Sequence, residues 1–343
     1  MQKSQSLDVV VLTYRRERML ERCLRSLDAA AGANSTRLRA IVVVNGADPA
    51  TSKTLSALTG ELDALEIEVV EVASPLPCGY ARNAGVEKAR GEWIYFADDD
   101  AWVDRDFFVT FASFIAAKPN LAVVGGPNLT DDSMTSFQKT AGAVLGSPFA
   151  AGPFSRRYRG GGKVETANDD RGLILCNLFV KRSAFAGYRF PEELSCAEEN
   201  HLLHFLDSEF PSDGKVFHPG LGVFHERAMT FKRFASSAIR YGRGRGELIS
   251  LDGWSMKSSK FILFALVFAL FAMIAAPLAT LLLYATTSFI HAIFISARTR
   301  NLTALATAPA LTLALHGLYP VGVAVGICQT PLRSFRSIRS ALR

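Results

Sequence analysis

The apolar and polar positions in the N-terminal part of the chain alternate between two patterns. Short apolar runs, typical of strands in a parallel sheet, occur at Asp8–Leu12, Leu38–Val44, Ile67–Val72 and Trp93–Ala97. The stretches between them have apolar residues at helical spacing, which predicts helices over Arg16–Leu27, Thr51–Leu62 and Tyr80–Ala89. Strands that alternate with helices predict an α/β fold with a mostly parallel sheet flanked by helices.

The C-terminal part has a different pattern, because charged residues almost vanish from Phe261 to Cys328, apart from Arg298 and Arg300. As one helix, the stretch Lys260–Ser296 would extend roughly 54 Å, whereas the core of a bilayer is about 30 Å thick. We therefore expect a break within this stretch, and Pro277 lies near its middle.

A second apolar stretch, Leu302–Cys328, is interrupted by Pro309, His316-Gly317 and Pro320. Two or three membrane helices fit residues 256–330. A pair of soluble core helices is the alternative, which the length and the lack of charge disfavour.

The last residues, 331–343, carry four arginines at intervals of three to four residues: Arg333, Arg336, Arg339 and Arg343. This spacing predicts a basic amphipathic helix that lies against anionic lipid on the cytosolic side. We expect residues 1–255 to form a cytosolic catalytic domain, followed by the membrane segment 256–330 and this tail.

Composition narrows the class of protein. Hydrophobic residues make up 49% of the chain, above an ordinary soluble domain. The net charge of +6 comes without a basic stripe interleaved with aromatic residues, which argues against a nucleic-acid partner. The five cysteines are scattered without a C-x-x-C pair, which argues against a disulfide framework and a zinc site. The N-terminal apolar run is too short for a signal peptide, so we expect a cytosolic N-terminal domain.

Three consecutive aspartates, Asp98, Asp99 and Asp100, follow the fourth predicted strand directly. Ligands of parallel α/β sheets bind off the carboxyl ends of the strands, which is where these carboxylates lie. Adjacent carboxylates repel one another unless a cation joins them, and Mg²⁺ and Mn²⁺ prefer oxygen ligands. A solvated acidic loop is the alternative.

The turn after the first strand excludes two common phosphate-binding loops. Thr13–Glu17 contains no glycine, so neither a dinucleotide G-x-G-x-x-G fingerprint nor a Walker loop is present there. The charge of a bound phosphate must then be neutralised in another way, and a metal held by the aspartates with help from Arg82 would do this.

An ordered set of segments resembles family 2 glycosyltransferases, which have the glycosyltransferase A-type nucleotide-diphospho-sugar transferase fold. The resemblance runs from Asp8 to about Arg245. Its segments are Val9–Leu27, Ile41–Gly46, Gly79–Asp100, Cys176–Phe185, Ala197–Asn200 and Val223–Glu226. Family members are inverting enzymes that move a sugar from a nucleotide diphosphate to an acceptor hydroxyl.

The resemblance implies roles for individual residues. Those implied to bind the nucleotide-sugar are Thr13, Tyr14, Asn45, Arg82, Asn83, Asp98 and Asp99. Those implied to hold a divalent metal, Mn²⁺ or Mg²⁺, are Asp98, Asp100 and His225, and Asp99 also lies within reach of it. Asn45 stands where the family commonly has an aspartate that bonds the base, usually uracil, and an asparagine still reads a base edge.

The acceptor hydroxyl needs a base, and Glu198-Glu199 stand where the family has a Glu-Asp pair at a helix start. The resemblance implies that Glu199 is the catalytic base beside Glu198. The alternative is that both glutamates only stabilise the positive end of a helix dipole.

Two glycine-rich segments have open roles. Arg240–Glu247 contains Arg240 and Arg243, and we expect a flexible stretch that closes over the diphosphate; a basic linker against lipid headgroups is the alternative. The loop Phe154–Gly172 is either a lid over the acceptor site or a disordered insertion. The Q-x-x-R-W motif of processive synthases is absent, which indicates transfer of one or a few sugars.

We therefore expect a metal-dependent, inverting glycosyltransferase at the cytosolic face of the inner membrane, in polysaccharide biosynthesis of the cell envelope. Its donor would be a nucleotide-diphospho-sugar, with UDP favoured, and its acceptor a lipid-linked sugar, glycolipid or polysaccharide precursor. A polyprenyl-phosphate sugar synthase and a non-catalytic scaffold subunit with the same fold are the alternatives.

Overall fold

The structure, a computed structural model, describes residues 6–33, 37–167, 171–209, 214–252 and 257–341. The chain divides into two compact units. The first, which we call the sheet unit, comprises residues 1–129, 159–193 and 198–226. The second, which we call the helical unit, comprises residues 130–158, 194–197 and 227–343.

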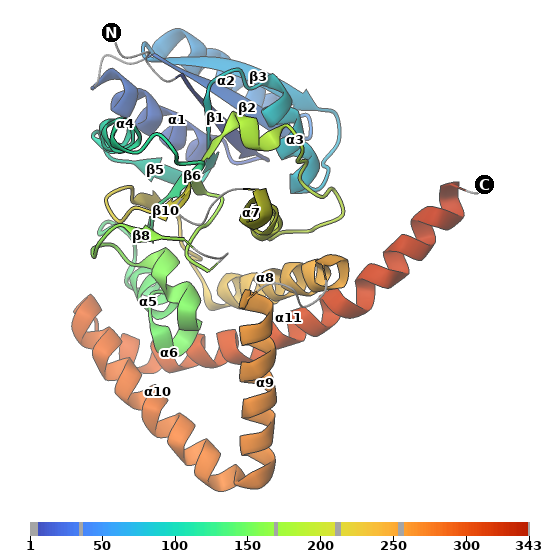
Figure 1. Cartoon of the computed structure of the whole chain (residues 1–343). Coiled ribbons are helices and arrows are strands. Elements are labelled where there is room, and N and C mark those ends of the chain that lie inside the picture. The colour runs from blue at the N-terminus through green and yellow to red at the C-terminus, as the bar shows by residue number, and fades with distance from the viewer. Residues whose placement is uncertain (1–5, 34–36, 168–170, 210–213, 253–256, 342–343) are drawn as a thin grey trace. The chain divides into compact units, whose positions relative to one another are not determined.

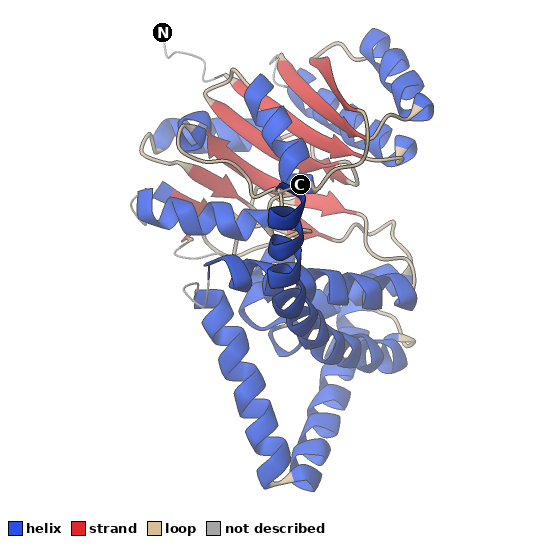
Figure 2. Ribbon diagram, turned by 90° about the vertical axis from the view of Figure 1, so that its right-hand side faces the viewer, coloured by secondary structure: helices blue, strands red, loops and turns tan. Residues whose placement is uncertain are grey.

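The sheet unit is built on a large sheet, drawn in red in Figure 2. The order of its strands is β3-β2-β1-β4-β9-β6-β10-β8. The strands are β1 (Leu7–Thr13), β2 (Leu38–Asn45), β3 (Leu65–Val72), β4 (Trp93–Asp98), β6 (Val123–Gly125), β8 (Glu165–Thr166), β9 (Asn177–Lys181) and β10 (Lys215–Phe217). The four predicted strands, β1 to β4, pair in parallel, which confirms the predicted α/β fold. β9 then joins β4 and β6 in antiparallel pairs.

Helices cover both faces of this sheet, which is why the middle residues of its central strands are apolar. Val9 and Val11 of β1 point into a core with helices α1, α2 and α4, whereas Val10 points into a core with α3 and α7. These helices are α1 (Glu17–Gly32), α2 (Pro49–Glu61), α3 (Cys78–Lys88), α4 (Phe107–Ala117) and α7 (Glu198–Glu209). A short 3₁₀ helix, η2 (Arg182–Phe185), follows β9.

A three-stranded sheet in the order β5-β11-β7 completes the sheet unit. Its strands are β5 (Ala101–Val103), β7 (Asn128–Leu129) and β11 (Val223–His225). β5 begins directly after the three aspartates, and its Ala101 pairs with His225 of β11. This pairing brings a residue from late in the chain to the end of β4.

The helical unit contains α5 (Ser136–Leu145), α6 (Pro148–Ala151), η1 (Gly152–Tyr158), α8 (Phe231–Asp252), α9 (Lys257–Ala275), α10 (Pro277–Thr299) and α11 (Ala304–Ala341). The expected break at Pro277 is confirmed: α9 ends at Ala275, and Pro277 occupies the first turn of α10. Proline suits that position because its missing N–H has no partner there in any helix. The two helices form a sharp hairpin (Figure 1).

The expected interruption of the second apolar stretch is wrong, since α11 runs through Pro309, His316-Gly317 and Pro320 without a break. A proline inside a helix removes one backbone hydrogen bond and bends the helix. In an apolar environment no water can replace the backbone hydrogen bonds that would be lost if the helix ended. Bending the helix at a proline therefore costs less free energy than ending it there. α11 is visibly bent (Figure 1).

The expectation of a flexible stretch at Arg240–Glu247 is also wrong, because these residues lie in the middle of α8. A Cβ atom on Gly242 would lie 2.1 Å from the carbonyl oxygen of Tyr319, and one on Gly246 would lie 2.1 Å from that of Val323. Gly322 and Gly326 of α11 are equally close to the backbone of α8. The glycines therefore allow two helix backbones to touch.

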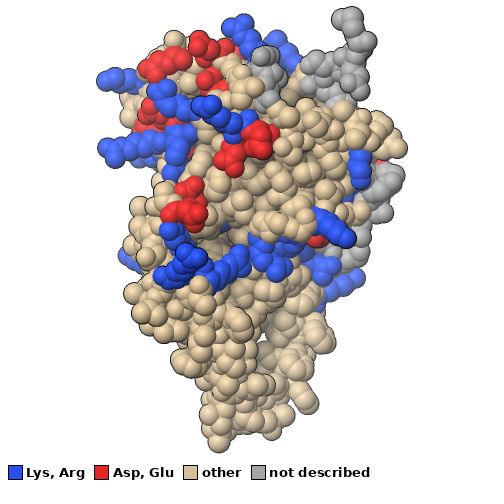
Figure 3. All heavy atoms as spheres, turned by 90° about the vertical axis from the view of Figure 1, so that its left-hand side faces the viewer, with Lys and Arg blue, Asp and Glu red and all other residues tan. Residues whose placement is uncertain are grey.

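Two helices in the described part of the chain, Pro277–Thr299 and Ala304–Gln329, are long and apolar enough to cross a bilayer. The apolar part of α9, Ser259–Ala275, is shorter. Large apolar side chains on the α9–α10 hairpin are exposed, with Ile274 at 73%, and that end of the space-filling view shows no charged side chain (Figure 3). The side chains of the predicted basic tail, 331–343, lie outside the described residues.

Candidate active site

Two neighbouring strands, β1 and β4, end at one edge of the large sheet. Asp98 is the last residue of β4 and Thr13 the last residue of β1, and the two strands run parallel. Asp99 and Asp100 form the turn between β4 and β5. The three carboxylates therefore lie where parallel α/β sheets bind their ligands.

The middle carboxylate, Asp99, is held by the protein itself. It is buried, its Oδ2 accepts a hydrogen bond of 2.9 Å from Thr13 Oγ1, and its Oδ1 lies 3.1 Å from Arg16 Nη1. Burial, and then repulsion by Asp100, raise the pKa of Asp99 to about 7, against the attraction of Arg16 and the hydrogen bond from Thr13.

The third carboxylate, Asp100, has two basic side chains as partners. Arg16 Nη1 lies 2.9 Å from its Oδ2, and His225 Nε2 lies 3.0 Å from its Oδ1. Burial would raise the pKa of Asp100, but attraction to His225 and Arg16 outweighs burial and lowers this pKa to about 2. Asp100 is therefore an anion at neutral pH.

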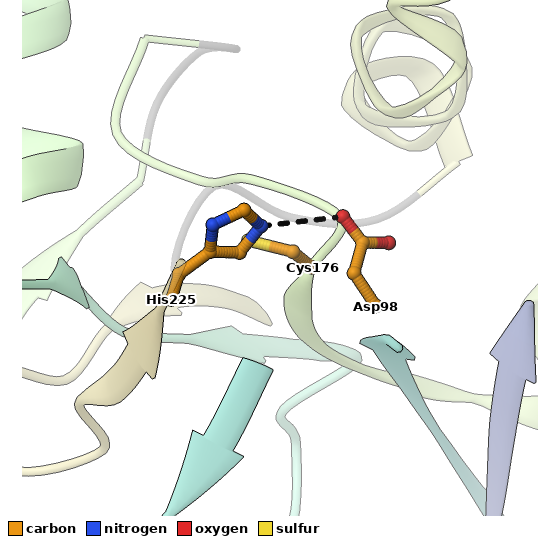
Figure 4. A group of neighbouring side chains, drawn as sticks. All are labelled: Asp98, Cys176 and His225. Carbon is orange, nitrogen blue, oxygen red and sulfur yellow. Dashed lines mark ion pairs between the residues drawn. The ribbon is translucent and has the colours of Figure 1, made fainter. Parts of the chain in front are cut away.

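Asp98 points toward the same histidine, because its Oδ2 lies 3.7 Å from His225 Nε2, and Arg82 Nη2 lies 3.7 Å from its Oδ1. Ligand atoms of Asp98, His225 and Cys176 all lie within 4.8 Å of one another (Figure 4). The structure thus brings together the three predicted metal ligands, Asp98, Asp100 and His225.

The hydrogen bonding of His225 shows whether these residues fit a cation. Its Nδ1 lies 3.0 Å from the backbone carbonyl oxygen of Glu226, and since a carbonyl only accepts, Nδ1 carries a hydrogen. A neutral imidazole then directs the lone pair of Nε2 at Asp98 and Asp100, so either a proton or a cation must separate them. Histidine ligands of metals commonly donate their other N–H to a carbonyl in this way, so the residues fit a divalent cation.

A buried ion pair joins α3 to the start of α7. Arg82 Nη1 lies 3.1 Å from Glu198 Oε1, and both side chains are largely buried. Burial raises the pKa of Glu198, although Arg82 opposes the shift. The next residue, Glu199, is partly exposed on the same first turn. The residue before the helix, Ala197, has φ +73°, a left-handed conformation that strains a residue with a Cβ atom.

The other predicted nucleotide contacts are placed as follows. Both polar groups of the Asn45 side chain bond the backbone of Leu76, and those of Asn83 bond the backbone of Phe190. These bonds fix loops beside the sheet edge. Tyr14 is 42% exposed just beyond β1. Contact of these residues with a nucleotide stays a prediction.

The predicted arginines of α8 belong to the helical unit. Arg243 Nε donates a hydrogen bond of 2.9 Å to Glu247 Oε1, one helical turn away. The guanidinium carbon of Arg240 lies 4.9 Å from the centre of the Tyr241 ring. Their contact with a diphosphate stays a prediction as well.

Two other histidines of the sheet unit have partners within the protein. His201 Nδ1 pairs with the hydroxyl of Tyr188, and His218 Nδ1 accepts a hydrogen bond from the backbone N–H of Gly220.

Sequence reasoning missed Arg16 and Cys176 as members of the site. Arg16 pairs with two of the three aspartates, Asp99 and Asp100. Its position just after β1 could have indicated this, because β1 and β4 are parallel neighbours that end at the same edge of the sheet. Cys176 precedes β9, which no local pattern placed beside β4.

Comparisons with known proteins identify the family to which this chain belongs. The sequence model of "Glycosyl transferase family 2" matches residues 8–189, more than half of the chain. The succinoglycan biosynthesis protein ExoM of Rhizobium meliloti (strain 1021) is 31% identical over 120 residues. The matched region covers 35% of this chain and 38% of that relative.

Solved structures share the fold at low sequence identity. The mannosyltransferase PcManGT from Pyrobaculum calidifontis, in complex with GDP-Man and Mn²⁺, has a TM-score of 0.59 at 17% identity, covering 94% of this chain and 86% of that one. S. aureus TarS 1–349, in complex with UDP-GlcNAc, has a TM-score of 0.51 at 16% identity, covering 97% and 92%.

The family match includes β1 with Thr13 and Arg16, α3 with Arg82, and β4 with its aspartates, so it covers most of the segments that build this sheet edge. The chain shares its fold with PcManGT and with TarS 1–349. We conclude that the chain belongs to glycosyl transferase family 2 and is a glycosyltransferase.

Proposed function

We propose that this glycosyltransferase moves a sugar, with inversion at the anomeric carbon, from a nucleotide-diphospho-sugar to a hydroxyl of a membrane-associated acceptor. The observation that carries the proposal is the meeting of Asp98, Asp100 and His225 beside Arg82 at the ligand-binding edge of the sheet. The donors in the two similar structures, GDP-Man and UDP-GlcNAc, support a donor of this class. We favour a UDP-sugar.

Asp98, Asp100 and His225 would hold a divalent cation, Mn²⁺ or Mg²⁺. When bound, it would neutralise the charge that the diphosphate gathers as it leaves. Arg82 lies next to Asp98 and would bind an oxygen of the same diphosphate. Mn²⁺ in the PcManGT complex supports the choice of metal.

Glu199 is our proposed base. The carboxylate of Glu198 is engaged with Arg82, so we assign Glu198 a positioning role at the start of α7. Glu199, partly exposed on the same turn, would accept the proton of the acceptor hydroxyl. The acceptor oxygen then bonds to the anomeric carbon as the bond from that carbon to the diphosphate oxygen breaks.

The apolar helices α9 to α11 support an acceptor at a membrane surface, such as a lipid-linked sugar, a glycolipid or a polysaccharide precursor. We propose that residues 1–255 face the cytosol at the inner membrane, with residues 256–330 in the bilayer and 331–343 on its surface. The name of the relative ExoM, a succinoglycan biosynthesis protein, supports a role in polysaccharide biosynthesis of the cell envelope.

Nucleotide release by the full chain in detergent tests the proposal. UDP-, GDP-, dTDP- and CMP-sugars are offered with Mn²⁺ or Mg²⁺, with and without a polyprenyl-lipid extract, and Asp100→Asn is measured beside the parent. We expect one nucleotide to be released only with metal and lipid, and the release to be lost in the variant. Release that survives chelation of metal, or equal release by Asp100→Asn, would contradict the proposed site.

A further inference from the structure

A cysteine lies among the side chains of the candidate metal site. Asn177 of β9 pairs with Ala97 of β4 in an antiparallel ladder, so the adjacent residues Cys176 and Asp98 leave the sheet side by side. His225 reaches the same place from β11 (Figure 4). The sulfur of Cys176, a carboxylate oxygen of Asp98 and a ring nitrogen of His225 lie within 4.8 Å of one another.

The sulfur is also buried and oriented. Cys176 is only 3% exposed, and Asn128 Nδ2 donates a hydrogen bond of 3.2 Å to its Sγ. Asn128 lies on β7, the neighbour of β11, so the strand pairing that places His225 also places this donor. An N–H group aimed at sulfur favours the thiolate, and donors behind a ligand commonly set its orientation.

We propose that Cys176 is a ligand of this metal site and makes the site prefer thiophilic divalent cations, such as Co²⁺ and Zn²⁺, over Mg²⁺. The inference rests on the proposed metal dependence and deepens it. Bonds of about 2.0–2.3 Å to nitrogen, oxygen and sulfur place ligand atoms roughly 3.5 Å apart, so shifts on the order of 1 Å would close the site. Binding releases the thiol proton to solvent.

The preference follows from ligand softness. Carboxylates and water suit Mg²⁺ and Mn²⁺, whereas thiolate and imidazole favour zinc and its neighbours in the transition series. The lack of a C-x-x-C pair concealed this arrangement, because the three ligands come from separate segments near residues 98, 176 and 225.

Absorption spectroscopy of the full chain tests the assignment without measuring activity. Metal-stripped protein in detergent is titrated with Co²⁺, and the sulfur-to-cobalt charge-transfer band is recorded for the parent, Cys176→Ser and Cys328→Ser. Cys328 is an exposed thiol on α11 and controls for adventitious binding. We expect the band in the parent and in Cys328→Ser, its loss in Cys176→Ser, and a loss of Co²⁺ affinity of about tenfold or more in that variant.

Two further measurements complete the test. Mg²⁺ affinity, measured by competition, should be unchanged in Cys176→Ser. Asp98→Asn should instead weaken the binding of both Co²⁺ and Mg²⁺. Thermal unfolding of metal-free Cys176→Ser should match the parent, and Cys176→Ala serves as a second variant if the serine protein unfolds.

The outcomes separate the inference from the proposed function. Co²⁺ binding without a charge-transfer band in the parent would overturn the role of Cys176 and leave metal dependence intact. A band that persists in Cys176→Ser, or disappears in Cys328→Ser, would assign the signal to another thiol and overturn the inference. Absence of Co²⁺ binding from every protein would overturn both the inference and the proposed metal site.

Discussion

At the scale of single residues, the three aspartates after β4 are tolerated because each has different partners. Asp99 is bonded by Thr13 and Arg16, Asp100 lies between Arg16 and His225, and Asp98 faces Arg82 and His225. Burial and repulsion by Asp100 together outweigh the partners of Asp99 and raise its pKa. Asp98 and Asp100 are the carboxylates that we propose to bind a cation.

Glu199→Gln should identify the acceptor chemistry. A hydroxyl acceptor needs its proton removed, so we expect turnover to fall about 10²- to 10⁴-fold with a smaller effect on donor binding. Glu209→Gln, at the exposed far end of α7, is the matched control and should retain parental turnover. A mild effect of Glu199→Gln would instead favour an acceptor that is already ionised, such as a lipid phosphate.

Asp8 should make stability depend on pH. It is buried at the start of β1, lies 2.6 Å from Arg39 Nη2, and accepts from the backbone N–H groups of Arg90 and Gly91. Burial would raise the pKa of Asp8, but the bonds from Arg39 and these two N–H groups outweigh burial and lower the pKa below its usual 3.8. Its stabilisation is therefore present above pH 3.8 and lost as the pH falls through the lower folded pKa.

We expect Asp8→Asn to lower the free energy of unfolding by about 3 kcal/mol at neutral pH, because Arg39 loses its buried partner. The difference from the parent should shrink below pH 3.8. Urea titrations across this range measure it, with exposed Asp132→Asn as the control. A pH-independent difference would show that lost packing, and not the ion pair, is responsible.

At the scale of elements, glycines decide how closely helices approach their neighbours. Helix α3, which carries Arg82, packs closely against the sheet, since a Cβ atom on Gly85 would lie 2.6 Å from Val10 Cγ1. A Cβ atom on Gly79 would lie 2.2 Å from the carbonyl oxygen of Pro191. The close approach at both glycines thus helps to place Arg82 beside Asp98.

Gly85→Ala should destabilise the sheet unit, because α3 would have to move away from β1 and β2. Overpacking of this kind costs about 1–3 kcal/mol. Gly60→Ala is the matched control: it also lies in a helix, but a Cβ atom there meets nothing within 4 Å, so it should stabilise by about 0.5–1 kcal/mol. Thermal unfolding in detergent distinguishes the two, and destabilisation by both variants would refute the packing argument.

At the scale of the whole molecule, segments far apart in sequence share one core in the helical unit. Its buried residues come from α5, α6, α8, α10 and α11, and they are Ala141, Val144, Ala150, Phe234, Ala292, Ile295, Ala304, Ala308 and Leu311. Residues 130–158 therefore belong structurally with the apolar C-terminal helices. The sheet unit has its own two cores on the faces of its large sheet.

Deletion of residues 256–343 should consequently give an aggregating protein. It would remove α10 and α11 from this core and expose the apolar faces of α5 and α8 to water. Size-exclusion chromatography of the truncated chain should show aggregates, whereas the full chain in detergent should elute as a defined species. A monodisperse, soluble 1–255 fragment would mean that the core in the helical unit is dispensable.

Membrane attachment is a separate prediction. The exposed apolar side chains of α9 and α10 should keep the full chain in the membrane fraction after washing with high salt and alkaline carbonate. Release by salt alone would indicate attachment by charge, for instance through the basic tail.

Local patterns along the sequence determined the elements of this protein. Runs of apolar residues predicted β1 to β4, helical spacing predicted α1 to α3, and Pro277 predicted the break between α9 and α10, because each depends on neighbours along the chain. The aspartates were assigned to the ligand edge because parallel strands carry their ligands at their carboxyl ends.

Only the tertiary structure decided which distant residues meet there. The antiparallel pairing of β9 with β4 placed Cys176 beside Asp98, and the pairing of β11 with β5 placed His225 beside Asp100. The composition of Arg240–Glu247 predicted a flexible stretch, but these residues lie in the middle of α8. Their glycines pack against the backbone of α11, a contact that no local pattern shows. Strand register and helix packing join residues far apart in sequence, so no local pattern contains them.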